Sequence, residues 1–404
     1  ARDGKTVLKE SALGLALNDA DFTNALTIKN TSAIKTINDD YEMMVGKKHK
    51  IHYSANEQTY TVKNSAGQEL MVTFRVSNDG VAFRYQVPNP DKKLLQFKNE
   101  TTSFAFSENA KAWLQPMAVA QTGFANTNPS YEEHYLMDIA VGTASPSPAG
   151  WVFPALYKID DTWVALTEVN VDGSFHGSRL QADSAKGEYK IGLPMAAEVF
   201  TGGNLLAESQ SDLISPWRVL AIGSLPTVME STLGTDLAAP AIPFDKKHLQ
   251  PGHASWSWAI LKDDFTVFDV QKKFVDYAVD MKWDYTLVDA DWDKKIGYEK
   301  MKELVDYATT KNIGIILWYN SSGDWNTTLM TPKSQLLTHE QRVKEFARLR
   351  EMGVKGLKID FFGGDSQSMI AYYVDILKDA AEYGLLINFH GATLPRGWQR
   401  TYPN

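Results

Sequence analysis

The sequence predicts a multidomain protein with two kinds of fold, an antiparallel β-sandwich in front and an α/β part behind it. Two observations lead to this prediction. Up to residue 240, short segments that alternate apolar and polar residues lie between turn signals, and long amphipathic helices are scarce. From residue 253 onward, short apolar segments alternate with helical patterns, which is typical of a parallel sheet covered on its faces. Residues 241–252 are expected to link the two parts.

Composition limits the classes of function. The chain has 404 residues, 44% of them hydrophobic and 22% charged, which is ordinary for a globular protein. Its formal net charge of −8 weighs against nucleic acid or an anionic membrane as a partner. No apolar stretch approaches the roughly 20 residues that cross a bilayer. The absence of cysteine excludes disulfides, thiolate catalysis and cysteine metal sites.

In the front part we expect a large β-sandwich over residues 1–240. Turn signals such as Asn78–Gly80 separate strand candidates that alternate in polarity. The expected strands cover residues 60–63, 70–76, 81–87, 150–154, 162–167 and 216–222.

In the rear part, residues 253–404, strands and helices alternate. Thr338 is expected to cap the third helix, and Gly384 to end the fourth. The expected strands cover residues 254–259, 285–290, 313–319, 354–360 and 385–390, and the expected helices cover 264–281, 298–310, 338–352 and 366–382.

These five βα units predict the first part of a (β/α)8 TIM barrel. Polar residues gather where the strands end, at Asp289, Asn320, Asp360 and His390, and such barrels carry their active sites there. A doubly wound sheet binds ligands at the same edge and is the rival arrangement. A closed barrel needs eight units, so we expect the remainder in a missing or separate segment of the natural protein.

The strand over residues 354–360 carries the sharpest chemical signal. Lys358 and Asp360 are two residues apart, so a strand points both side chains to one face. A nearby cation favours the ionised carboxylate, which is the form that a nucleophile needs. A structural ion pair at the end of a strand is the alternative.

The strand over residues 285–290 runs into a cluster of acids. Asp289, Asp291 and Asp293 alternate around Trp292, which suits the binding of sugar hydroxyls or of a hard cation such as calcium. Helix-capping aspartates in a polar loop are the alternative. Several further aromatic residues at strand ends are either core residues or sugar platforms, namely Trp256, Trp258, Trp318, Tyr319 and Trp325.

The motifs of several other chemistries do not occur in the sequence. It has no phosphate-binding loop, no His-Glu-x-x-His zinc motif and no nucleophile elbow. Carboxylates without a phosphate or redox motif favour glycosyl transfer, in which two acids work as a pair.

Two segments of the rear part resemble glycoside hydrolase family 97. They are Val354–Asp365, which contains Gly-Leu-Lys-Ile-Asp-Phe-Phe-Gly-Gly-Asp, and Asn388–Trp398, which runs into Arg-Thr-Tyr-Pro-Asn at residues 400–404. The resemblance extends over the whole chain, because members of this family have an N-terminal β-supersandwich before the barrel. It implies a bacterial enzyme that is periplasmic or secreted.

The resemblance implies the retaining branch of the family, whose known members are α-galactosidases. The inverting α-glucosidases lack the carboxylate of strand four and have a Glu after the His of strand five, whereas this chain has Asp360 and Gly391. Carried over, Asp360 is the catalytic nucleophile of a double displacement on oligosaccharides with a terminal α-galactose. The implied substrate contacts are Lys358, Asp289, Asp291, Trp292, Trp318 and His390.

The same resemblance implies a calcium ion near the catalytic acid, with Glu132 as a ligand from the front part. The acid/base Glu of the family is expected beyond Asn404, so this chain shows one of the two carboxyl groups that retaining hydrolysis needs. An α-glucosidase of the same family and a carbohydrate-binding protein without catalysis are the alternative functions.

Overall fold

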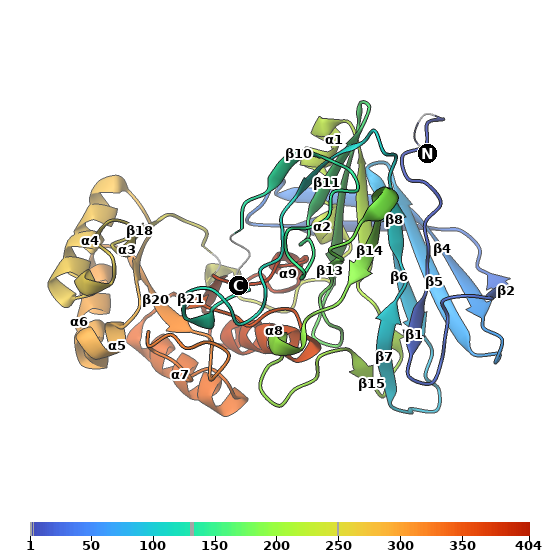
Figure 1. Cartoon of the computed structure of the whole chain (residues 1–404). Helices are drawn as coiled ribbons and strands as arrows, with labels where there is room; N and C mark the ends of the chain where they lie inside the picture. The colour runs from blue at the N-terminus through green and yellow to red at the C-terminus, as the bar shows by residue number, and fades with distance from the viewer. Residues whose placement is uncertain (1, 3, 130–132, 249) are drawn as a thin grey trace.

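The computed structural model describes residues 2, 4–129, 133–248 and 250–404. A β-rich part and an α/β part lie side by side, with the blue-to-green strands of Figure 1 on one side and the yellow-to-red elements on the other. Between α2 (Leu233–Asp236) and β18 (Ala254–Trp256), the described residues form only the short turn η4 (Lys246–His248). No helix in the described ranges is long and apolar enough to span a bilayer.

An antiparallel sheet dominates the β-rich part and has eleven strands among the described residues. Its long strands bury alternate side chains, as expected for a sheet with one covered face. The order is β10 (Leu136–Ala140), β9 (Lys111–Leu114), β11 (Ala155–Ile159), β12 (Thr162–Val169), β17 (Trp217–Gly223), β6 (Gly80–Val87), β5 (Glu69–Ser77), β4 (Lys50–Lys63) and β2 (Thr27–Thr31), with β3 (Lys35–Glu42) beside β4 and β16 (Leu213–Ile214) beside β6.

Two smaller sheets pack against this large one through a shared hydrophobic core that includes Leu15, Phe97, Phe104 and Tyr189. They consist of β1 (Leu15–Leu17), β7 (Leu95–Glu100) and β15 (Glu208–Ser209), and of β13 (Arg179–Leu180), β14 (Glu188–Gly192) and β8 (Ser103–Ala105). The helical turns of this part are η1 (Phe124–Asn126), η2 (Ala185–Gly187), η3 (Ala196–Glu198) and α1 (Leu225–Glu230). The predicted β-rich front part is therefore confirmed.

One predicted strand of the front part, at residues 150–154, is wrong. Trp151 makes only isolated bridges, to Pro116 on one side and to Leu180 on the other. Pro154 has no N–H to give to a ladder, and the strand β11 begins after it.

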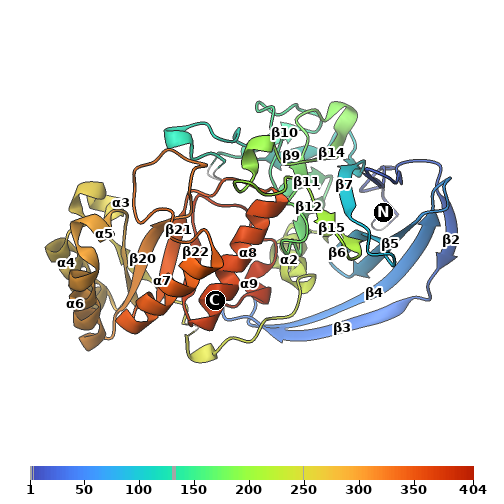
Figure 2. The ribbon, with the colours of Figure 1, turned by 90° about the horizontal axis from the view of Figure 1, so that it is seen from below.

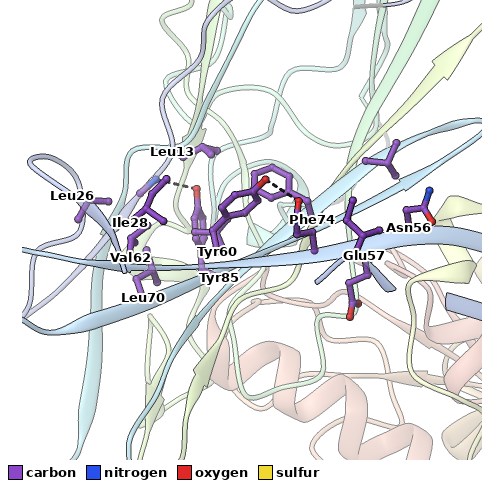
Figure 3. A pocket seen from close by; sticks show the side chains of 15 residues that line it. Leu13, Leu26, Ile28, Asn56, Glu57, Tyr60, Val62, Leu70, Phe74 and Tyr85 are labelled. Carbon is purple, nitrogen blue, oxygen red and sulfur yellow. Dashed lines mark hydrogen bonds between the residues drawn. The ribbon is translucent and has the colours of Figure 1, made fainter. Parts of the chain in front are cut away.

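One end of the sandwich core is not filled. A hollow of about 610 Å³ lies among β2, β4, β5 and β6. Figure 3 shows aliphatic and aromatic side chains in its lining, among them Leu26, Ile28, Val62 and Phe74, together with the polar Asn56 and Glu57. None of the residues that the sequence predicts to contact the substrate lines this hollow.

A buried ion pair crosses the sandwich. Arg218 on β17 donates from Nε and Nη2 to both oxygens of Glu100 on β7, at 3.0 and 2.5 Å. Its Nη1 donates to Glu168 on β12, at 2.5 Å. Arg218 and Glu168 are 0% exposed and Glu100 is 2% exposed, so each charge depends on these partners to offset its removal from water.

We expect Arg218→Ala to destabilise the protein strongly, because it leaves the buried carboxylate of Glu100 without its cation, whereas Glu168 keeps Arg396. Breaking a buried pair in this way costs about 3–5 kcal/mol. Chemical denaturation measures the change as a lower free energy of unfolding. The control is Lys302→Ala, which removes an exposed pair with Asp306 and is expected to cost only about 0.3–0.5 kcal/mol. Equal losses in both variants would contradict the prediction.

Parallel strands form the sheet of the α/β part. Among the described residues they are β18, β19 (Tyr285–Val288), β20 (Gly314–Asn320), β21 (Gly356–Asp360) and β22 (Leu386–Phe389), and each pairs with the next along the chain. A doubly wound sheet reverses its strand order, whereas the strands of a barrel follow one another in sequence. The observed order therefore argues against the doubly wound arrangement.

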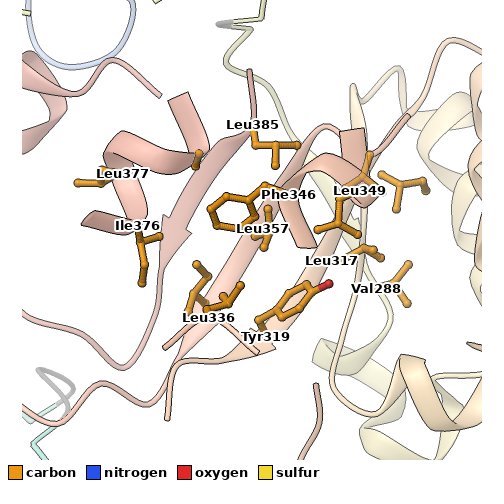
Figure 4. Close-up of a cluster of buried hydrophobic side chains, with 14 of the residues drawn as sticks. Val288, Leu317, Tyr319, Leu336, Phe346, Leu349, Leu357, Ile376, Leu377 and Leu385 are labelled. Carbon is orange, nitrogen blue, oxygen red and sulfur yellow. The ribbon is translucent and has the colours of Figure 1, made fainter. Parts of the chain in front are cut away.

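Four helices cover one face of these strands, as Figure 2 shows, namely α4 (Phe268–Met281), α6 (Gly297–Thr310), α7 (His339–Met352) and α8 (Gln367–Glu382). The side chains between helices and strands form a compact hydrophobic core, part of which is drawn in Figure 4. Thr338 caps α7 as predicted, since its hydroxyl accepts a hydrogen bond from the N–H of Gln341. The shorter helices are α3 (Trp258–Leu261), η5 (Asp263–Phe265), α5 (Trp292–Lys295) and α9 (Trp398–Thr401).

The first βα unit differs from its prediction. The strand ends at Trp256 rather than at residue 259, and the following residues form α3. The helix expected from residue 264 begins at Phe268. Lys262 lies between them with a left-handed φ of 63°, which interrupts a continuous helix.

Candidate active site

Polar side chains of the α/β part converge at the edge of the sheet where its strands end. Asp360 is the last residue of β21, and Lys358 precedes it on the same face. Trp318 on β20 lies next to Lys358 in the pairing of β20 with β21. Asp289 and His390 directly follow β19 and β22. The fold therefore brings together five of the residues that the sequence singled out.

The carboxylate of Asp360 is surrounded by hydrogen-bond donors and is only 4% exposed. Its Oδ2 lies 3.1 Å from Nε1 of Trp318 and 3.1 Å from Nδ1 of His390. The ammonium of Lys358 lies 3.6 Å from the same oxygen. Its Oδ1 accepts a hydrogen bond from the N–H of Phe361, at 2.9 Å. Every one of these contacts favours the charged form of the carboxylate.

The pKa of Asp360 lies below its ordinary value. Burial alone raises this pKa, but the hydrogen bond and charge of His390, the charge of Lys358 and the N–H of Trp318 together lower it by more. Asp360 is therefore ionised at neutral pH. An ionised carboxylate at the mouth of the sheet can act as a nucleophile.

Lys358 lies between two carboxylates. Its ammonium is 3.2 Å from Oδ2 of Asp289, which also accepts a hydrogen bond from Nε1 of Trp256 at 2.6 Å. The ammonium also lies 4.4 Å from the centre of the Trp256 ring. That ring stacks on Trp258 with an angle of 18° between the planes. Trp256 thus belongs to the site, although the sequence indicated only that it is an aromatic residue at a strand end.

Two of the predicted contacts lie elsewhere. Asp291 has a left-handed φ of 64°, which ends the alternation of the strand, and its carboxylate accepts hydrogen bonds from the N–H and hydroxyl of Thr331. Trp292 is 0% exposed in the hydrophobic core, where its indole N–H donates to the carbonyl of Trp318. Neither side chain contacts the Asp360 carboxylate group in the described residues: Asp291 binds the loop at Thr331, and Trp292 belongs to the core.

Gly391, which follows His390, provides room for the Asp360 carboxylate. Its φ is +52°, and a Cβ added there would lie 2.7 Å from Oδ1 of Asp360 and 3.1 Å from the nitrogen of Phe361. Its carbonyl accepts a hydrogen bond from the N–H of Phe362, at 2.9 Å, which holds the two loops together. A side chain at position 391 and a carboxylate at position 360 therefore exclude each other in this geometry.

The predicted calcium ligand, Glu132, lies outside the described residues. Within them, no group of three or more His, Asp or Glu side chains is arranged to hold a metal ion. The calcium ion therefore stays a prediction.

Acidic, cationic and indole side chains at the strand ends of a parallel βα sheet define the kind of site found in carbohydrate-active enzymes. Comparison with known families agrees with this class. Residues 1–240 match the N-terminal part of glycosyl hydrolase 97, and residues 257–404 match glycoside hydrolase 97. The chain belongs to glycoside hydrolase family 97.

Two curated relatives are similar over most of the chain. One is described as a probable retaining α-galactosidase of Streptomyces bingchenggensis (strain BCW-1), with 31% identity over 418 residues, 100% of this chain and 60% of that protein. The other is a retaining α-galactosidase of Bacteroides thetaiotaomicron, with 26% identity over 82% of this chain and 52% of that protein. The chain thus spans less than two thirds of the length of either relative.

Solved structures have the same fold. One described as a β-arabinopyranosidase superposes with a TM-score of 0.92 and 37% identity, over 100% of this chain and 64% of that one. A family 97 enzyme of Pseudoalteromonas sp. strain K8 in complex with acarbose has a TM-score of 0.80 at 21% identity, over 99% of this chain and 64% of that one. The second likeness concerns the fold alone.

Proposed function

We propose that the protein is a retaining, exo-acting α-galactosidase that hydrolyses terminal α-galactosides of oligosaccharides by double displacement. The observation that carries this proposal is the Asp360 carboxylate, which is buried among three donors that favour its ionised form. Gly391 leaves the space beside it free of a side chain. The descriptions of the two curated relatives support the same activity.

The first step would form a covalent intermediate. The carboxylate of Asp360 attacks the anomeric carbon of the galactoside, and the bond from that carbon to the leaving oxygen breaks. An acid/base in the part of the protein outside this sequence donates a proton to the leaving oxygen. It then takes a proton from water, which attacks the same carbon, releases Asp360 and gives galactose of the original anomeric configuration.

Other groups of the site would hold the sugar. Asp289 can accept hydrogen bonds from sugar hydroxyls, and Lys358 can donate to them. The indole N–H groups of Trp256 and Trp318 donate to Asp289 and Asp360 and so hold these two carboxylates in place. His390, whose side chain is 44% exposed, is open to the substrate side of Asp360.

We also propose that the parallel sheet is the first part of a (β/α)8 barrel that a further segment closes. On β19 and β20 the side chains that face the helices are buried, whereas Leu287 and Ile316 on the opposite face are only half-buried, as is Leu386 on β22. An apolar sheet face of this kind is normally buried against further elements of the protein. A crystal structure of the full-length protein tests the proposal, and an open sheet would contradict it.

A β-L-arabinopyranosidase is the second candidate, because the structure described as a β-arabinopyranosidase is 37% identical to this chain. The two sugars have the same configuration from C1 to C4, and the arabinoside lacks only the hydroxymethyl group on C5. The contacts of Asp289 and Lys358 would therefore serve either ring. The rate on the arabinoside relative to the galactoside measures what the hydroxymethyl group contributes.

The experiment compares 4-nitrophenyl α-D-galactopyranoside, β-L-arabinopyranoside and α-D-glucopyranoside as substrates of the full-length protein, with NMR detection of the anomer released first. We expect α-galactose first. A preference for the arabinoside with retention moves the protein to the second candidate. Release of β-glucose first would contradict the nucleophilic role of Asp360, and binding of galactose without turnover would indicate a carbohydrate-binding protein.

Lys358→Met is expected to lower activity most at acidic pH. The charge of Lys358 lowers the pKa of Asp360, so its removal raises that pKa, and less of the carboxylate is ionised as the pH falls. The acidic limb of kcat/KM should move to higher pH. At neutral pH kcat/KM should fall by roughly 10- to 100-fold, in line with hydrogen bonds to charged groups. Lys355→Met, an exposed lysine before the same strand, is the control, and an equal effect there would refute the role of Lys358.

A further inference from the structure

A chain of buried ion pairs joins the β-rich part to the loops that carry Asp360 and His390. The loop after β21 ends at Asp365, and the segment after β22 contains Thr393 and Arg396. Asp365 is 0% exposed and Arg396 is 3% exposed. Neither is needed to touch a sugar, so their burial calls for another explanation.

Both ends of this series of ion pairs lie in the β-rich part. Glu168 on β12 accepts a hydrogen bond from Nε of Arg396, at 2.5 Å, and is itself held by Arg218. Glu198 at the end of η3 accepts a hydrogen bond from the backbone N–H of Asp365, at 2.8 Å. Glu198 is fixed in turn by Nη2 of Arg179, at 2.5 and 2.6 Å. Glu168 lies on a strand and Glu198 at the end of a helical turn, and both are 0% exposed, so the β-rich part provides two buried anchor points.

Between the anchors, Asp365 and Thr393 tie the two loops to each other. Nη2 of Arg396 lies 3.1 Å from Oδ2 of Asp365. The hydroxyl of Thr393 donates to Oδ1 of Asp365 and accepts a hydrogen bond from Nη1 of Arg396. A single guanidinium therefore bridges Glu168, Asp365 and Thr393.

The two loops also meet beside the reacting group. Phe361, directly after Asp360, has a left-handed φ of 66°, and its carbonyl accepts a hydrogen bond from Nε1 of Trp325, at 3.0 Å. The N–H of Phe362 donates to the carbonyl of Gly391. Any shift of one loop against the other thus changes the distance between His390 and Asp360.

We propose that Arg396 is a positioning residue, which braces both loops against the β-rich part and so keeps His390 at hydrogen-bond distance from the Asp360 carboxylate. This inference rests on the proposed function for its kinetic consequence. Arg396 is 3% exposed, and its guanidinium is engaged by Glu168, Asp365 and Thr393. It acts through Asp365 on one loop and through Thr393 on the other.

Loss of the brace has a specific signature. The groups that face Asp360 are Lys358 on β21, Asp289 after β19, His390 after β22 and the indole of Trp318 on β20. When the brace relaxes, only His390 moves away with its loop, and the pKa of Asp360 rises. The acidic limb of kcat/KM therefore moves to higher pH, and kcat falls, because a shift of about 1 Å in an active site can cost roughly 100-fold.

The test uses the full-length protein with Arg396→Lys, which keeps the charge but loses the bridging geometry, and Thr393→Val, which removes the bridging hydroxyl. The matched control is Arg400→Gln. Arg400 is 5% exposed and also binds the β-rich part, through the carbonyls of Thr235 and Asp236 and the carboxylate of Asp39, away from the two loops. All three variants are expected to lower the melting temperature.

We expect only Arg396→Lys and Thr393→Val to move the acidic limb and to lower kcat, by roughly tenfold or more. Hydrogen exchange of residues 359–365 and 388–393, read by mass spectrometry, should rise in these two variants and not in Arg400→Gln. An unchanged pH profile and unchanged exchange in Arg396→Lys overturn the proposal. If the wild type hydrolyses no glycoside, the proposed function fails, and the exchange measurement alone decides the bracing.

Discussion

Asp360→Ala is expected to abolish hydrolysis while the protein stays folded. The variant lacks the group that forms the covalent intermediate, and comparable removals in covalent hydrolases cost roughly four to six orders of magnitude in kcat. The fold should survive because Lys358 keeps its contact with Asp289, so no buried cation is left alone. Initial rates on 4-nitrophenyl α-galactoside and a thermal melt by circular dichroism measure the two quantities.

Azide supplies a control for the chemistry of that variant. It can enter the space left by the carboxylate and attack the anomeric carbon from the β face, so rescue should yield β-galactosyl azide, which NMR identifies. Asp306→Ala, on an exposed turn of α6, is the matched substitution and should leave the rate unchanged. Full activity of Asp360→Ala without azide would exclude the nucleophilic role.

Gly391→Ala is expected to reduce activity nearly as much, although it adds only one methyl group. The added Cβ would lie 2.7 Å from Oδ1 of Asp360, so the carboxylate must move. A displacement of about 1 Å costs roughly 100-fold in kcat or more. The left-handed backbone at this position adds about 1–2 kcal/mol of strain for a residue with a side chain. Steady-state kinetics and the melting temperature check both effects.

Two further variants separate these causes. Gly353→Ala, at the end of α7, has the same kind of left-handed backbone far from the site, so it should lose stability and keep its rate. Adding Asp360→Gly to Gly391→Ala removes the overlapping carboxylate and should restore part of the melting temperature, while the double variant stays inactive. Additive losses of stability in the double variant would contradict the steric explanation.

The elements of the α/β part could be predicted because each has a local signal. The strand that ends at Asp360 is a short apolar run, and Thr338 stands where a helix begins. Once the strands are parallel and sequential, the juxtaposition of Asp289, Lys358 and Asp360 follows, because their positions at strand ends determine it.

The loop after β19 could not be predicted in this way. Alternation along a strand suggested that Asp291 shares the face of Asp289, but a single left-handed residue turns the chain there. Trp292 then points into the core between the sheet and its helices. The partner that fixes this turn, Thr331, belongs to a different loop, and no local pattern connects it to Asp291.

The ionic chain around Arg396 shows the same limit over a longer range. Glu168, Glu198, Asp365 and Arg396 lie in four separate segments, and each looks like an ordinary surface charge in its own neighbourhood. Only the packing of the two parts removes them from water together. The periodicity of the sequence shows which residues face a core, but it does not show which charged residues are buried next to one another.

This series of ion pairs has a consequence for folding during synthesis on the ribosome. Glu100, Glu168 and Arg218 emerge long before Arg396, and at 5–20 residues per second the interval between Arg218 and Arg396 is about 10 to 40 s. During that time the nascent sandwich contains two acids for one guanidinium at its centre. The β-rich part therefore receives the second cation of this cluster only after Arg396 has been synthesised.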